Sequence, residues 1–150
     1  MGSPPVERQL ARPPAKLIDF QHLGWAFSGP GSIFSREDAI IPDVLWISRE
    51  RWAQVVGKDG KLHGAPEIAI EVLSPGSANT RRGGVAKLRL YSEQGVLEYW
   101  LADYRKQTVA IYRRQGARLQ LHTTLTRADT LTSPLLPGFA LPVARLFDRA

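Results

Sequence analysis

The chain has 150 residues, 43% of them hydrophobic, with a formal net charge of +6 and no cysteine. This length and composition support one domain with a hydrophobic core and make a second domain unexpected. The absence of cysteine excludes disulfides, zinc-thiolate sites and thiol nucleophiles, while the basic charge favours a polyanionic partner such as nucleic acid.

Residues 1–16 are rich in proline and charge, so we expect a disordered extension followed by a single domain over residues 17–150. The opening residues lack the apolar core of a secretory signal, and no later segment approaches membrane-spanning length. The sequence therefore predicts a soluble, cytoplasmic protein with no membrane partner.

The first half of the domain reads as strands. Residues 23–29 and 31–34 flank a Gly-Pro-Gly turn, and residues 42–48 (PDVLWIS) form a strand opened by proline. One helical turn and a glycine-rich loop follow. Residues 67–74 (EIAIEVLS) are almost continuously apolar, which is typical of a central strand covered on both faces.

The second half begins with a helix from Thr80 to Gln94, with Asn79 as its N-cap and Gly95 at its end. Consecutive antiparallel strands follow over residues 96–103, 108–114 and 118–125. The proline-broken apolar tail, residues 131–147, is expected to cross the core as a strap and finish in a helical turn. This order predicts an α/β (α+β) fold with a mixed, mostly antiparallel, twisted sheet and few flanking helices.

Glu71 is the unusual residue of the central strand, since burying an unpaired carboxylate among apolar neighbours is very costly. A helical wheel places Lys87 opposite the solvent face of the following helix, between Leu90 and Tyr91. Two interpretations stay open. The ammonium either extends along the surface to water or points inward and pairs with Glu71.

Asp43 is a second acid at the start of an apolar run, and a strand next to residues 68–73 would bring it beside Glu71. Two neighbouring carboxylates repel unless a cation lies between them. A magnesium-type ion takes oxygen ligands and retains water, so two acids and a backbone carbonyl would suffice. The ammonium of Lys87 would then orient a water molecule or neutralise charge on a phosphoryl oxygen.

The pattern of Asp43 after proline, Glu71 in an apolar strand and a nearby lysine resembles the PD-(D/E)XK nuclease superfamily, which has the restriction-endonuclease-like fold. More narrowly, PDVLWIS, APEIAIEVLSPGSANTRR, KLRLYSEQGVLEYWLAD and LTSPLLPGF resemble the Uma-two-type restriction endonucleases over about residues 23–147. The resemblance implies a nuclease core that uses a divalent metal, Mg²⁺ or Mn²⁺, to hydrolyse DNA phosphodiester bonds, often as a homodimer.

Within this resemblance, Asp43 and Glu71 match the metal-binding acids, and the carbonyl of Val72 would lie next to the metal. The superfamily's usual lysine position is Leu73 here, and Lys87 from the following helix matches its replacement in the Uma-two-type pattern. Asp43, Glu71 and Lys87 are therefore the expected catalytic residues.

The sequence departs from the pattern in two places. Gly83 and Gly84 stand where an acid is expected, and only a short proline-rich segment precedes residue 23. We therefore expect a shortened member with an incomplete site. The alternative function is a catalytically degenerate module that binds nucleic acid or a protein without cleavage. Arg81 and Arg82, at the start of the helix, are the candidate phosphate contacts.

Other polar and aromatic residues are expected to be structural. Tyr99 and Trp100 are more typical of a sheet core than of base stacking. Glu98 and Asp103 flank the same strand and are expected to make solvent or turn contacts. The three histidines lack metal-ligand spacing.

Overall fold

The computed structural model describes residues 23–28, 42–73 and 80–148, with the side chains of residues 80–85 outside this description. The expectations for the extension over residues 1–16, for the strand at 31–34 and for Asn79 lie outside the described residues. No helix within the described ranges is long and apolar enough to span a membrane.

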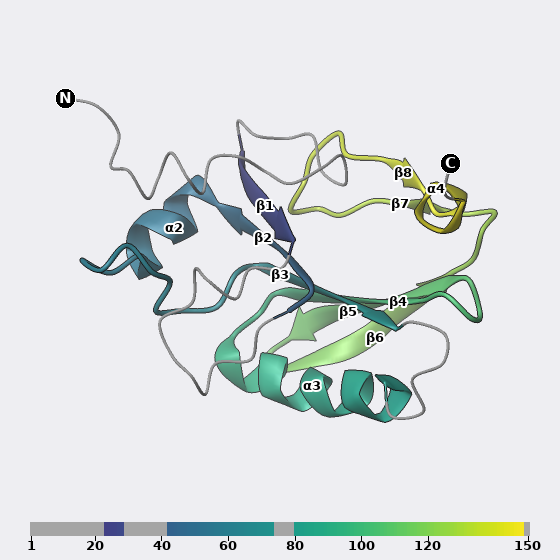
Figure 1. Ribbon diagram of the computed structural model, residues 1–150, viewed down its shortest axis with the longest axis horizontal. Coiled ribbons are helices and arrows are strands. Elements are labelled where there is room, and N and C mark those ends of the chain that lie inside the picture. Colours follow the sequence, from purple (N-terminus) through teal and green to yellow (C-terminus); the bar gives the residue numbers. More distant parts are fainter. Residues whose placement is uncertain (1–22, 29–41, 74–79, 149–150) are drawn as a thin grey trace.

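Within the described residues, one sheet carries six strands whose spatial order follows the chain (Figure 1). Neighbouring strands are antiparallel except for the central pair β3 and β4, which are parallel. Parallel strands need a long crossover, and the helix α3 supplies it. The predicted mixed, mostly antiparallel sheet with few helices is confirmed. The strands are β1 (Gly24–Ser28), β2 (Val44–Ser48), β3 (Ile68–Leu73), β4 (Glu98–Asp103), β5 (Thr108–Gln115) and β6 (Arg118–Leu125), and α3 is Thr80–Gln94.

The strand β3 is apolar on both sides because both faces of the sheet are covered there. Ile68 and Ile70 pack on one face with the C-terminal residues, whereas Ala69 and Leu73 pack on the other face with α3. Glu71 alternates with Ile70 and therefore lies on the α3 face. The prediction of a central strand at this position agrees with the structure.

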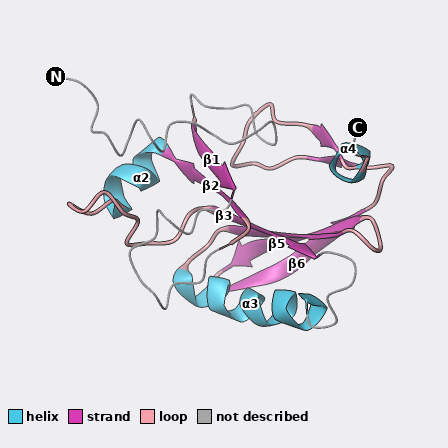
Figure 2. Ribbon diagram, in the orientation of Figure 1, coloured by secondary structure: helices cyan, strands magenta, loops and turns pink. Residues whose placement is uncertain are grey.

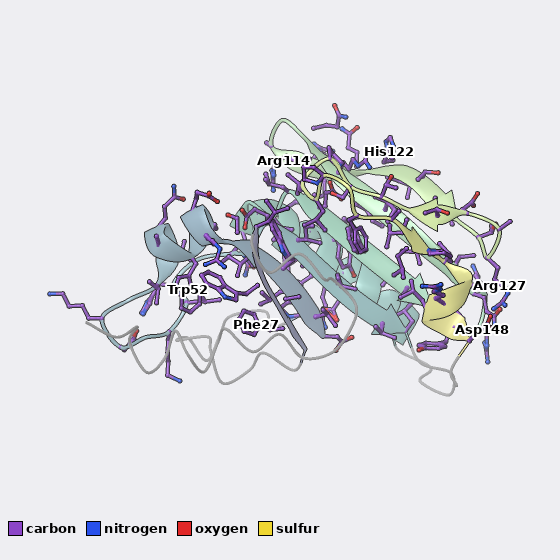
Figure 3. All side chains as sticks on the ribbon, turned by 90° about the horizontal axis from the view of Figure 1, so that it is seen from above. Phe27, Trp52, Arg114, His122, Arg127 and Asp148 are labelled. Carbon is purple, nitrogen blue, oxygen red and sulfur yellow. The ribbon has the colours of Figure 1, made fainter. Side chains whose placement is uncertain are left out.

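The helix α2 (Arg49–Val55) covers β1 and β2 on the same face as α3. Its N-cap is Ser48, whose hydroxyl accepts a hydrogen bond from the Arg51 amide at 3.0 Å. Trp52 is buried on its inner side and meets Trp25 edge to face, with ring centroids 5.7 Å apart. Figure 3 shows Trp52 under the helix, close to Phe27.

The C-terminal residues cover the opposite face of the sheet (Figure 2). They form β7 (Thr130–Leu131), β8 (Leu141–Pro142) and the short helix α4 (Ala144–Phe147). Phe139 stacks on Trp100 of β4 at a centroid distance of 6.2 Å. The expected strap with a final helical turn is present, with the addition of a small two-stranded sheet formed by β7 and β8.

Candidate active site

Glu71 is the buried acid of β3, with only 4% of its surface exposed. The ammonium of Lys87, from α3, donates to both carboxylate oxygens at 3.2 Å. Since the Lys87 side chain is still 38% exposed, its stem lies near the surface while its tip turns inward. The structure thus favours the inward, paired interpretation of Lys87 over the solvated one.

Tyr91 is a third member of this cluster that sequence reasoning missed as a polar partner. Its hydroxyl donates to the Oε2 atom of Glu71 at 2.7 Å, and the residue is 1% exposed. Tyr91 lies one turn after Lys87, so both side chains leave the same face of α3. Two signals in the sequence could have identified Tyr91. It lies four residues after Lys87, and a buried phenol needs a hydrogen-bond partner.

The electrostatics of the cluster are dominated by burial. Desolvation raises the pKa of Glu71; the hydrogen bond from Tyr91 opposes this rise, the charge of Asp43 adds to it, and the ammonium of Lys87 lowers the pKa. Burial and the neighbouring Glu71 carboxylate also raise the pKa of Tyr91. Tyr91 therefore stays protonated and acts as the hydrogen-bond donor.

Asp43 lies at the start of β2, next to Glu71. The register pairs Val44 with Ile70, and one further step along both strands places Asp43 opposite Glu71. The exposed Asp43 carboxylate accepts a hydrogen bond from the Val72 amide at 2.8 Å through Oδ2. The two acids therefore meet at one end of the β2–β3 pair.

The carbonyl of Val72 faces the same flank of β3 as Asp43. The N–H and C=O groups of one strand residue point to the same neighbouring strand, and the Val72 amide points to Asp43. The next carbonyl, of Leu73, points the other way and accepts the amide of Tyr104 at 3.1 Å. Two carboxylates and one carbonyl thus gather on this flank.

This donor set fits a hard divalent cation, which prefers oxygen ligands and retains water. Within the described ranges, the Oε1 atom of Glu71 accepts only the ammonium of Lys87, and the Oδ1 atom of Asp43 accepts no hydrogen bond. In the same part of the chain, there is no place where three or more His, Cys, Asp or Glu side chains lie close enough together to hold a metal ion. A cation here would need the Val72 carbonyl and water to complete its shell.

The two expected phosphate contacts, Arg81 and Arg82, lie in the first turn of α3, where the structure does not describe side chains. The same applies to Gly83 and Gly84. The backbone of α3 places all four at the end of the sheet where β3 finishes.

The expectation that Glu98 contacts solvent is wrong. Glu98 is 2% exposed on the face of the sheet opposite Glu71, where it accepts hydrogen bonds from Trp100 Nε1 at 2.9 Å and from the Ser133 hydroxyl at 2.8 Å. It is buried because the C-terminal segment brings Ser133 over β4. Asp103 makes the expected turn contacts, and Tyr99 and Trp100 are core residues.

Comparisons with known proteins bear on the family and the fold of the chain. No curated protein matches the chain. A crystal structure described as that of a putative nuclease belonging to DUF820, from Anabaena variabilis ATCC 29413, matches with a TM-score of 0.61 and 21% identity. The match covers 95% of this chain and 74% of that chain, and it shows a shared fold.

The family model described as "Uma2: Putative restriction endonuclease" matches residues 6–144. The match begins earlier than the resemblance seen in the sequence, which starts at about residue 23. It spans nearly all of the chain and includes Asp43, Glu71 and Lys87. The chain therefore belongs to the Uma2 family of restriction-endonuclease-like proteins.

Proposed function

We propose that this protein is a divalent-metal-dependent endonuclease that hydrolyses DNA phosphodiester bonds. The observation that carries the proposal is the buried Glu71 carboxylate, held between Lys87 and Tyr91 and opposite Asp43. Membership of a nuclease-like family, whose relatives generally use divalent metals, supports it. The roles of the individual residues are predictions.

Asp43, Glu71 and the Val72 carbonyl are the proposed ligands of Mg²⁺ or Mn²⁺. Such an ion supplies a water molecule of lowered pKa and neutralises charge on a phosphoryl oxygen. Lys87 holds the Glu71 carboxylate in place and provides a positive charge beside the phosphate position. Tyr91 fixes the orientation of the same carboxylate from the buried side.

A plasmid-nicking assay tests this proposal. We expect nicking that requires Mg²⁺ or Mn²⁺, stops with a chelator and is lost in Asp43→Ala. Asp59→Ala is the matched control because Asp59 is an exposed acid in the loop after α2, away from the site. Nicking that persists in Asp43→Ala would contradict the assigned site.

The second candidate function is a nucleic-acid-binding or protein-binding module that does not cleave. The glycines at 83 and 84, and the absence of a three-residue metal cluster in the described ranges, favour it. Calorimetric titration with Mn²⁺ distinguishes the two functions. An endonuclease should show binding that disappears in Asp43→Ala, whereas a non-cleaving module should show no heat of binding at these acids.

Tyr91→Phe should lower the cleavage rate by about 10-fold to 100-fold, because partners that orient a metal ligand typically contribute this much. The ring remains and only the hydroxyl bond to Glu71 is lost. The measurement is the Mg²⁺ dependence of nicking, which should shift to higher concentration. Tyr112→Phe is the control, since Tyr112 stacks on Tyr99 without a hydroxyl bond to Glu71. Equal effects of both variants would rule out a specific role for the Tyr91 hydroxyl.

A further inference from the structure

The turn between β4 and β5 lies at the same end of the sheet as the candidate active site. The strands β3 and β4 run in parallel, with Leu73 opposite Asp103, so both finish at this end. The Tyr104 amide donates to the Leu73 carbonyl at 3.1 Å and joins the turn directly to β3. In Figure 1 the turn projects on the right, the side on which α3 begins.

The backbone of this turn is firmly held. One oxygen of Asp103, Oδ1, accepts the amides of Arg105 and Lys106 at 3.0 and 3.1 Å. Tyr104 packs edge to face on Phe147, and its hydroxyl donates to the Leu146 carbonyl at 3.2 Å. The turn is therefore anchored to the sheet and to α4, which leaves the two cationic side chains exposed at its tip.

Arg105 and Lys106 are exposed cations at this end of the sheet. In the part of the chain that the structure describes, neither side chain has a hydrogen-bond or ion-pair partner. Two neighbouring cations are already engaged. Lys87 binds Glu71, and Arg127 binds Asp148 at 2.7 Å, as Figure 3 shows beside α4.

The spacing suits a nucleic acid strand. Asp103 lies on the strand next to Glu71 and two residues further along. The distance between the two backbone positions is therefore about 8 Å. Phosphates recur about every 3.4 Å along the axis of one DNA strand. Side chains at the tip of the turn would thus meet phosphates a few nucleotides from the one at the carboxylates.

We infer that Arg105 and Lys106 form a contact surface for the DNA backbone, binding phosphates that flank the reacting one. The inference rests on the proposed function for the identity of the polyanion. It does not depend on cleavage, because phosphate contacts contribute affinity whether or not the site is active.

The test compares two double variants with equal charge changes. Arg105→Ala with Lys106→Ala removes the proposed contacts. Lys58→Ala with Arg118→Ala is the matched control. Both residues are exposed, Lys58 in the loop after α2 and Arg118 at the start of β6, at the end of the sheet opposite to the β4–β5 turn. Affinity for a fluorescently labelled DNA duplex is measured by anisotropy without divalent metal, over a series of salt concentrations.

We expect the first double variant to bind more weakly, with the slope of log affinity against log salt reduced by about 2. The control pair should keep the wild-type slope. Equal slopes for all three proteins would overturn the inference, and so would equal losses in both variants, which indicate a non-specific effect of charge.

Thermal unfolding and the nicking assay, run on the same proteins, separate this inference from the proposed function. If the wild-type protein nicks DNA and the turn variant binds normally, the inference is wrong and the proposed function stands. If the wild-type protein binds without nicking and only the turn variant loses affinity, the inference stands and cleavage is refuted. A wild-type protein that neither binds nor nicks DNA overturns both.

Discussion

Glu71→Gln should reduce metal-dependent nicking by about 1000-fold, equivalent to about 4 kcal/mol of transition-state stabilisation. Glutamine retains the shape and an acceptor for the Tyr91 hydroxyl, but it removes the negative charge that binds both the cation and Lys87. The measurement is the initial rate of plasmid nicking at saturating Mg²⁺. Substantial activity in this variant would exclude Glu71 as a metal ligand.

The same variant should be more stable than the wild-type protein near neutral pH in the absence of metal. The pKa of Glu71 is raised by burial, so the ionised carboxyl disfavours the folded state, and this cost appears as the pH rises above the ordinary value of 4.5. Below that pH the carboxyl is neutral in both states and the cost is absent. Thermal unfolding across this pH range should show the advantage of glutamine growing with pH. If Glu71→Gln is instead destabilised and partly unfolded, its loss of nicking is explained by misfolding and not by the loss of a metal ligand.

Glu98→Ala should lower the free energy of unfolding by about 3 kcal/mol. The substitution leaves two buried donors, Trp100 Nε1 and the Ser133 hydroxyl, without their acceptor. It also removes the carboxylate 3.8 Å from the guanidinium Nε of Arg113. Urea unfolding followed by tryptophan fluorescence measures the change as a shift in midpoint.

Glu98→Gln is the control for this second prediction, because its amide oxygen can accept from Trp100 while its nitrogen donates to Ser133. It should retain most of the stability, and its nicking rate should equal that of the wild-type protein, since Glu98 lies on the opposite face of the sheet from Glu71. An unchanged midpoint in Glu98→Ala would show that Glu98 does not fasten the C-terminal segment to β4.

The proposed site was largely predictable because charged residues at apolar positions stand out in a sequence. Glu71 and Lys87 occupy apolar positions and Asp43 begins an apolar run, so strand pairing predicts that the two acids meet. Helix periodicity places Lys87 on the inner face but leaves open whether its ammonium turns inward. Residue type alone could not assign Tyr91, since a tyrosine on an inward helix face is equally typical of a core. Its role depends on the partner of its hydroxyl, which is Glu71 in the structure.

Glu98 shows a different limit of sequence reasoning. Glu98 begins a strand, and the sequence around it does not distinguish a carboxylate exposed to solvent from a buried one. Burial is decided by Ser133, which comes 35 residues later and reaches Glu98 only through the tertiary fold. The general sheet order was predictable because neighbouring segments pair, whereas contacts made by the irregular C-terminal segment leave no periodic signal.

The spatial order of the described strands follows the order in which the ribosome makes them, so each strand after β1 has a neighbour that is already synthesised. The C-terminal segment is the exception, because Leu136, Phe139 and Val143 cover an apolar surface formed much earlier. A nascent chain therefore carries that surface uncovered until residues 136–143 have left the ribosome. During this interval the surface is open to aggregation and to chaperone binding.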